Sequence, residues 1–200
     1  QAAYVDLPLV VHALRTSFAA LGKFRDETFH HSELKPTAIG WQYRDLHTDN
    51  VIFCEGAAAQ DNPWFKNLPL EPAKGETLLC QSPTLRLPQK LYHHKKWFLP
   101  YADGTFRLGA TYDESDLSDV PTAGKRDELL RSAHEALKEP HQIEVTAHLS
   151  GIRPSTLDSR PIIGAHSTCL GLYLINGLGS KGASTAPAMT QQLNEHILKK

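Results

Sequence analysis

The sequence predicts a mixed α and β fold of the α+β type, and three features carry the prediction. Apolar residues recur at helical spacing near both ends of the chain, over 7–21 and 183–198. Short apolar runs of the kind that form buried strands stand at 51–59 and 171–175. Between them, the dipeptide Asp103-Gly104 separates two strand-like stretches, and this pattern predicts a hairpin in an antiparallel sheet.

The N-terminal part is expected to begin with a helix and continue into a buried strand. The apolar spacing over 7–21 predicts a helix that packs inside a fold, and Gly22 is placed to cap it. The run VIFCEGAAA, residues 51–59, predicts a buried strand whose small final residues let another group approach. The stretch 62–78 carries three prolines and predicts an extended linker, so we expect a domain boundary near residue 62.

The middle of the chain predicts an antiparallel sheet with one helix. The strand-like stretches are LRLPQKLY, KWFLPY and FRLGATY, and the last two are joined by the turn at 102–105. Residues 122–137 have the spacing of an amphipathic helix, and Pro140 is expected to end it. A further strand is expected at 143–149.

Composition excludes several classes of protein. The 200 residues, of which 40% are hydrophobic, are enough for one or two globular domains. A formal net charge of -1 gives no overall field that would attract nucleic acid or an anionic membrane. The three cysteines are far apart in the sequence, so neither a disulfide framework nor a CxxC site is indicated, and we expect them to be reduced. The sequence has neither a stretch of about eighteen uncharged apolar residues nor the basic-then-apolar order of a signal peptide, so cytoplasmic residence is the expectation.

A glycine-rich turn joins the last predicted strand to the last predicted helix, in the stretch LINGLGSKGASTAP. Gly177, Gly179 and Gly182 permit positive φ and close approach of the backbone. A helix that begins directly after them presents unpaired N–H groups and a partial positive charge. The turn is therefore either a cradle for an anion or a polar ring, or a tight strand-to-helix connection that binds nothing.

Several motifs together resemble the flavin-dependent D-amino-acid oxidase superfamily, which includes glycine and sarcosine oxidases. The stretches that carry the resemblance are YVDLPLVVHALR, VIFCEGAAA, LPLEPAKGETL, WFLPYADGTFRLGATYD and GIRPSTLDSRPIIG. They occur in the family's order and cover most of the chain. The stretch GLGSKG is most similar to the oxidase domain of the wobble-uridine-modifying tRNA enzyme.

The resemblance implies an enzyme with FAD as cofactor and with two parts. Residues 1–62 and 149–200 would belong to an FAD-binding domain, and 63–148 would form a substrate domain built on an antiparallel sheet. The family's GxGxxG strand and helix, which bind the FAD pyrophosphate, have no match in this sequence. We therefore expect this chain to be a C-terminal portion whose partner is a missing N-terminal FAD-binding segment.

Arg153, in GIRPSTLD, is the leading candidate for substrate binding. A guanidinium group binds a carboxylate through two parallel hydrogen bonds and stays charged at any relevant pH. In the enzymes that this sequence resembles, the matching arginine binds the carboxylate of the amino acid. The alternative is a structural arginine that pairs with Asp158 or Glu144.

The resemblance also implies a flavin contact and an aromatic wall. Backbone N–H groups at the start of the last helix would face the pyrimidine edge of the flavin, where negative charge develops on reduction. These residues are Gly177, Leu178, Gly179, Ser180, Lys181 and Gly182. Trp97 and Tyr101 occupy hairpin positions where family members place aromatic residues over the substrate, although aromatic residues in a sheet more often belong to a core. Lys181 is equally compatible with an ordinary surface lysine.

The function that these observations predict is oxidation of the C–N bond of an amino acid or a secondary amine. If the amine arrives neutral, no catalytic acid or base is required among the side chains, because the flavin itself takes the hydride. The histidines lack the spacing of a zinc site, so no metal is expected, and no membrane or nucleic-acid partner is expected for this chain alone. The alternative is a non-catalytic binding or scaffold domain that keeps the sheet and lacks FAD.

Overall fold

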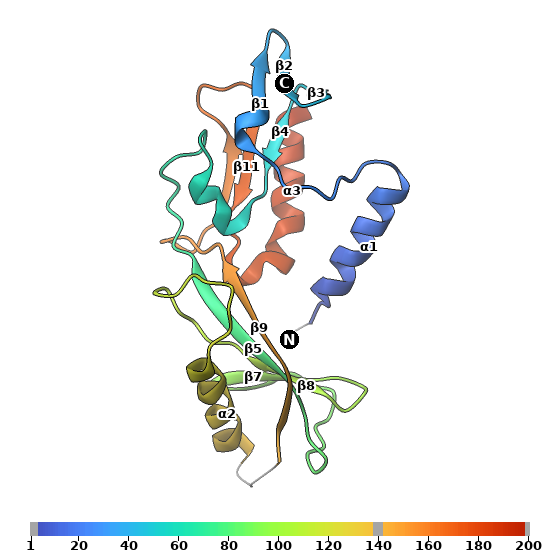
Figure 1. The fold of residues 1–200 in the computed structure, drawn as a ribbon, viewed down its shortest axis with the longest axis vertical. Coiled ribbons are helices and arrows are strands. Elements are labelled where there is room, and N and C mark those ends of the chain that lie inside the picture. The colour runs from blue at the N-terminus through green and yellow to red at the C-terminus, as the bar shows by residue number, and fades with distance from the viewer. Residues whose placement is uncertain (1–3, 138–141, 199–200) are drawn as a thin grey trace. The chain divides into compact units, whose positions relative to one another are not determined.

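The computed structural model describes residues 4–137 and 142–198, which divide into two compact units. One unit runs through Leu70 and resumes at Thr156, and the other covers Glu71–Ser155. The sequence placed the two junctions near 62 and 148. Figure 1 shows the elements of both units in chain order, and each unit is described by itself.

The N-terminal helix α1, Leu7–Ala20, has clear signals at both ends. The Asp6 carboxylate accepts a hydrogen bond from the Leu9 N–H at 3.1 Å, which caps the N-terminus. At the other end Gly22 adopts a φ of 63°, and the Gly22 and Lys23 N–H groups donate back to the carbonyls of Ala19 and Phe18. The predicted cap is thus present. None of the helix residues is buried, so its apolar face, expected inside a fold, is exposed.

Two small sheets form the core of the first unit. The strands β1 (Leu34–Thr37), β2 (Gly40–Tyr43) and β3 (Leu46–Thr48) make an antiparallel meander. The second sheet has the order β10-β11-β4, with β4 at Val51–Phe53, β10 at Ile162–Ala165 and β11 at Leu172–Asn176. The pair β11 and β4 is parallel, whereas β10 and β11 are antiparallel. The buried apolar residues of this core are Leu34, Trp41, Tyr43, Phe53, Leu172 and Leu174.

Short helical turns flank the strands of the first unit. The run VIFCEGAAA is a strand only through Phe53, because Gly56 takes a φ of 60° and starts the 3-10 turn η2, Gly56–Asp61. A second 3-10 turn, η1, covers His31–Glu33. After β11, the 3-10 turn η3 (Gly179–Lys181) leads directly into α3, Gly182–Leu198.

The second unit is a five-stranded antiparallel sheet with the order β6-β7-β8-β5-β9, covered on one face by a helix (Figure 1). The bounds are β5 Ala73–Gln81, β6 Tyr92–His94, β7 Lys96–Pro100, β8 Phe106–Gly109, β9 Glu144–Arg153 and, for the helix, α2 Ala123–Leu137. The predicted hairpin joins β7 to β8, with Gly104 at a φ of 85°. Helix and sheet share one buried apolar core: Leu78, Cys80, Phe98, Phe106, Leu108, Leu129 and Ala133.

Two predicted elements of this unit differ in extent. Within LRLPQKLY, residues 85–91 form no strand, because Pro88 lacks an N–H for a ladder, and only Tyr92–His94 pairs with β7. The strand expected at 143–149 runs on to Arg153, since it pairs with β5 along nearly its whole length. Pro140, the predicted end of α2, lies outside the described residues.

The cysteines, possible metal-binding groups and helix lengths also bear on the sequence expectations. Cys54, Cys80 and Cys169 are all free thiols. Across 4–137 and 142–198, no group of three or more His, Cys, Asp or Glu side chains is placed to hold a metal ion. Within the same residues, every helix is too short or too polar to cross a membrane.

Candidate functional site

The register of the five-stranded sheet decides which side chains share a face. Residues directly opposite each other in an antiparallel pair point to the same side. Arg153 pairs with Ala73, Gly75 pairs with Gly151, and Thr77 pairs with Gly109, which in turn pairs with Trp97. Because side chains alternate along β5, all of these residues lie on one face, here called the Arg153 face. Helix α2 covers the opposite face, through Leu78 and Leu108.

The guanidinium group of Arg153 lies directly over Gly75. A Cβ atom at position 75 would come within 2.0 Å of Arg153 Nη2 and 2.3 Å of Nη1. Nη2 donates a hydrogen bond to the Thr111 carbonyl at 3.3 Å. Nη1 is buried and, among the described residues, has no hydrogen-bond partner. Burial lowers the pKa of Arg153 from its ordinary value.

The carboxylates proposed as structural partners of Arg153 are engaged elsewhere. Asp158 Oδ1 accepts the Arg160 N–H at 3.0 Å, and Glu144 Oε2 accepts Gln81 Nε2 at 2.7 Å. No ion pair involves Arg153 within the part of the chain that the structure describes. A buried donor of fixed charge and no partner is an arrangement that a carboxylate ligand would satisfy.

The two aromatic candidates lie in different places. Trp97 is half-buried on the Arg153 face, where its ring packs over Gly109. Tyr101 follows the end of β7, whose last residue pairs with Phe106, and Phe106 pairs with Cys80. Cys80 and Ala73 are seven residues apart on β5, about 23 Å at the rise of a strand. The sheet therefore brings Trp97 toward Arg153 and does not bring Tyr101 there.

Three residues near Arg153 were not singled out from the sequence. Gly75 gives the guanidinium its room, Thr111 supplies the carbonyl that it binds, and the Tyr112 ring centroid lies 5.8 Å from Arg153 Cζ. Tyr112 is exposed. The glycine between two charged residues in the stretch PAKGET was an available signal, since a glycine inside a strand often marks the close approach of another group.

The glycine-rich turn of the first unit stands at the carboxyl ends of the parallel strands β4 and β11. Gly177 directly follows β11, is buried, and has a φ of 69°. A Cβ atom there would lie 2.6 Å from Thr156 Cγ2. The side-chain amide of Asn176 donates to the Gly56 carbonyl at 2.8 Å, which links the last residue of β11 to the turn that follows β4. Ligands of open α/β sheets bind at this edge.

The remaining residues of the turn lead into α3. Gly179 has a φ of 52°, Leu178 is half-buried, and Ser180 and Lys181 are exposed. Gly182 is the first residue of α3, so the first N–H groups of this helix lack intrahelical acceptors. Glycines with positive φ beside a helix N-terminus fit a polar ring system or an anion that approaches the backbone closely.

Comparison with known proteins gives the class to which this fold and site belong. The profile of the DAO family, described as FAD dependent oxidoreductase, matches residues 1–195. The chain belongs to this family, and the cofactor of the family is FAD. The glycine turn at the strand ends, described above, fits that cofactor. The predicted resemblance is thus confirmed at the level of the family.

Particular relatives include amino-acid oxidases. A glycine oxidase from Pseudomonas putida is 32% identical over 148 residues, which are 73% of this chain and 40% of that protein. The tRNA 5-methylaminomethyl-2-thiouridine biosynthesis bifunctional protein MnmC of Marinobacter nauticus is 29% identical over 167 residues, which are 77% of this chain and 26% of that protein. The chain therefore spans less than half the length of these relatives.

Solved structures show the same fold. An iminodiacetate oxidase from Chelativorans sp. BNC1 superposes with a TM-score of 0.69 at 22% identity, over 84% of this chain and 48% of that one. A glycine oxidase from Geobacillus kaustophilus gives a TM-score of 0.63 at 27% identity, over 74% of this chain and 42% of that one.

Proposed function

We propose that this chain is the C-terminal portion of an FAD-dependent oxidoreductase that oxidises the C–N bond of an amino acid or a secondary amine. The observation that carries the proposal is the guanidinium of Arg153, with its buried and unpartnered Nη1. The relatives named glycine oxidase and iminodiacetate oxidase act on small substrates of this chemical class, which supports it. Cytoplasmic residence belongs to the same proposal.

In this proposal Arg153 binds and orients the substrate carboxylate. Nη1 would donate to one carboxylate oxygen while Nη2 stays held by the Thr111 carbonyl. Trp97 would limit the space on the same face and exclude water from it. Because the guanidinium keeps its proton throughout, Arg153 supplies a fixed positive charge and orients the substrate carboxylate, and it transfers no proton.

The turn at 177–182 would hold the flavin in the same proposal. Its backbone N–H groups at the start of α3 would hydrogen-bond a polar ring edge, and Lys181 would add positive charge nearby. When bound, FAD supplies the acceptor for a hydride from the carbon that bears the amine. None of the chain's side chains is assigned as acid or base.

Arg153→Lys and Arg153→Met in the intact, FAD-loaded protein test the proposal. With sarcosine as substrate, both variants should raise KM strongly, because the lysine ammonium lacks the planar guanidinium that places one donor on the Thr111 carbonyl and another on the carboxylate, and methionine has no donor at all. Bleaching of the flavin's visible absorption by sarcosine without oxygen would report the oxidation itself. Unchanged KM in both variants would remove Arg153 from the site, and a protein that binds no FAD would favour a scaffold domain.

A further inference from the structure

Lys74 and Glu76 are buried charges on the α2 side of β5. Each side chain is only 1% exposed, and Lys74 Nζ lies 3.5 Å from Glu76 Oε1. They flank Gly75, and the Arg153 guanidinium lies over Gly75 on the opposite face of the sheet. Removing two charges from water is costly, and well-packed apolar residues often replace a buried ion pair without loss of stability. The two charges therefore call for a role beyond stability.

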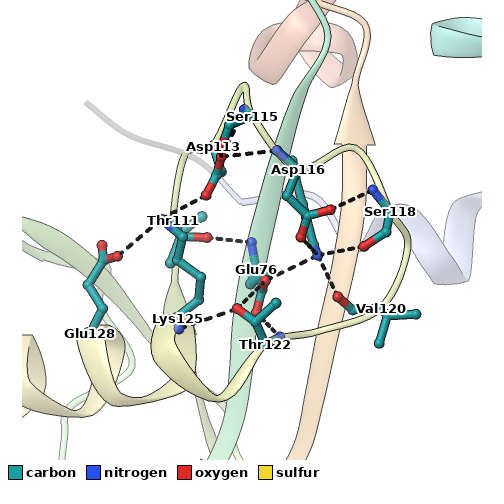
Figure 2. A network of polar contacts seen from close by, with 12 residues as sticks. Glu76, Thr111, Asp113, Ser115, Asp116, Ser118, Val120, Thr122, Lys125 and Glu128 are labelled. Carbon is teal, nitrogen blue, oxygen red and sulfur yellow. Dashed lines mark hydrogen bonds and ion pairs between the residues drawn. The ribbon is translucent and has the colours of Figure 1, made fainter.

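The Lys74 side chain fastens the segment 111–122, which connects β8 to α2. Lys74 Nζ donates to Asp116 Oδ2 at 2.6 Å and to Ser118 Oγ at 3.2 Å. It also donates to the Val120 carbonyl. Figure 2 shows these three residues converging on one nitrogen. A single buried ammonium group thus uses its three donors on three positions of one loop.

Glu76 fastens the end of the same segment. Its carboxylate accepts the Thr122 N–H at 3.0 Å and the Thr122 hydroxyl at 3.1 Å (Figure 2). His148 Nε2, on the neighbouring strand β9, lies 2.7 Å from Glu76 Oε2. The segment is therefore held at 116–120 by the lysine and at its last residue by the glutamate.

The start of the segment is held by the main chain of the same two residues. The Lys74 and Asp113 backbones exchange hydrogen bonds of 2.7 and 3.0 Å. The Thr111 N–H donates to the Glu76 carbonyl at 3.1 Å, and the Thr111 hydroxyl accepts the Glu76 N–H at 2.9 Å. Between these two anchors lies Tyr112, whose ring faces Arg153, and the Thr111 carbonyl accepts Arg153 Nη2. Lys74 and Glu76 thus bind the segment whose residues Thr111 and Tyr112 contact Arg153.

We propose that the buried Lys74–Glu76 pair is the positioning element for Arg153. The pair fastens segment 111–122 from the covered side of β5, and that segment holds the guanidinium on the other side with Nη1 directed to a ligand. This inference rests on the proposed role of Arg153 in binding a carboxylate. Lys74 and Glu76 are positioning residues, since neither side chain lies on the Arg153 face.

The experiment uses the intact, FAD-loaded protein and acetate as the carboxylate probe, with affinity measured by calorimetry. Asp116→Asn and Glu76→Gln keep side-chain shape while they remove one charge each, and Asp116 is only partly buried, so its variant should fold. Glu135→Gln is the matched control, because Glu135 pairs with Lys95 at 2.9 Å on the exposed side of α2. Each test variant should bind acetate about tenfold more weakly, the loss of roughly one hydrogen bond to a charged group. The control should match the wild type.

Two further readouts separate positioning from general destabilisation. In an Arg153→Met background the same substitutions should weaken acetate binding no further, since residues that act through one partner are not additive. Amide exchange of residues 111–122 should rise in Asp116→Asn and Glu76→Gln and stay unchanged in Glu135→Gln. Additive effects in the double variants, or unchanged acetate affinity and exchange in folded single variants, would overturn the inference.

The failure of the proposed function gives a different pattern. If Arg153→Met binds acetate as tightly as the wild type, Arg153 is no carboxylate ligand, and both the proposed function and this inference fall. If Arg153→Met loses acetate while Asp116→Asn and Glu76→Gln keep it, only the positioning role falls.

Discussion

Replacing Gly75 with alanine tests the geometry of Arg153 without changing any charge. The new Cβ atom would stand 2.0 to 2.3 Å from three guanidinium atoms, where carbon contacts need about 3.5 Å. The guanidinium must therefore move by about 1.5 Å. Because the atoms in the way are the far end of a flexible side chain, we expect the fold to keep its stability, with Tm within about 4 °C of the wild type.

The expected loss is in substrate binding. A hydrogen bond to a charged group contributes about 1.5–3 kcal/mol, which corresponds to roughly a 10- to 150-fold fall in kcat/KM for sarcosine. Gly151→Ala is the matched control, because Gly151 pairs with Gly75 on the same face and a Cβ atom there would meet nothing within 4 Å. The assay is steady-state kinetics of the intact enzyme, with thermal melts of both variants. Equal kinetics for the two alanine variants would refute the reasoning.

Three further predictions concern the second unit. Leu129→Ala removes a fully buried core side chain and should cost about 2–5 kcal/mol of unfolding free energy in urea titrations, whereas a loss below about 1 kcal/mol would show that the core does not pack as described. Burial raises the pKa of the Cys80 thiol to about 12, so iodoacetamide should label Cys80 at pH 8 only after unfolding, and labelling of the folded protein would contradict its burial. Lys74 lowers the pKa of Asp116 to about 2, below its unfolded value, so this carboxylate stabilises the fold above about pH 4 and loses that effect as the pH falls toward 2. In Asp116→Asn the urea concentration at the unfolding midpoint should fall less with decreasing pH over that pH range than it does in the wild type. An equal fall in both proteins would count against the Lys74–Asp116 ion pair.

Local sequence signals predicted the elements whose conformation is set by residues adjacent in the sequence. The dipeptide Asp103-Gly104 identified the hairpin, because its conformational needs are set within four residues. Gly22 identified the end of α1 for the same reason. Residues 85–91 have strand-like composition and form no strand, because Pro88 has no N–H to donate to a neighbouring strand. Composition alone does not tell whether such a neighbouring strand is present.

The surroundings of Arg153 depend on register and on contacts distant in sequence. Charged residues such as Lys74 and Glu76 usually face solvent, and their burial follows from a loop that returns over them after some forty residues. The place of Gly75 under the guanidinium could be assigned only once β5 and β9 were paired. Motif resemblance pointed to Arg153 as a candidate, while the residues that contact it could be assigned only from the pairing of the sheet.

The most direct test of the central claim compares sarcosine with dimethylamine, which lacks the carboxylate, in the intact FAD-loaded enzyme and its Arg153→Met variant. The ratio of kcat/KM for the two substrates measures what the carboxylate contributes. If Arg153 binds that carboxylate, the wild type should prefer sarcosine and the variant should lose most of that preference, while kcat/KM for dimethylamine stays nearly unchanged. An equal preference for sarcosine in both proteins would contradict the account.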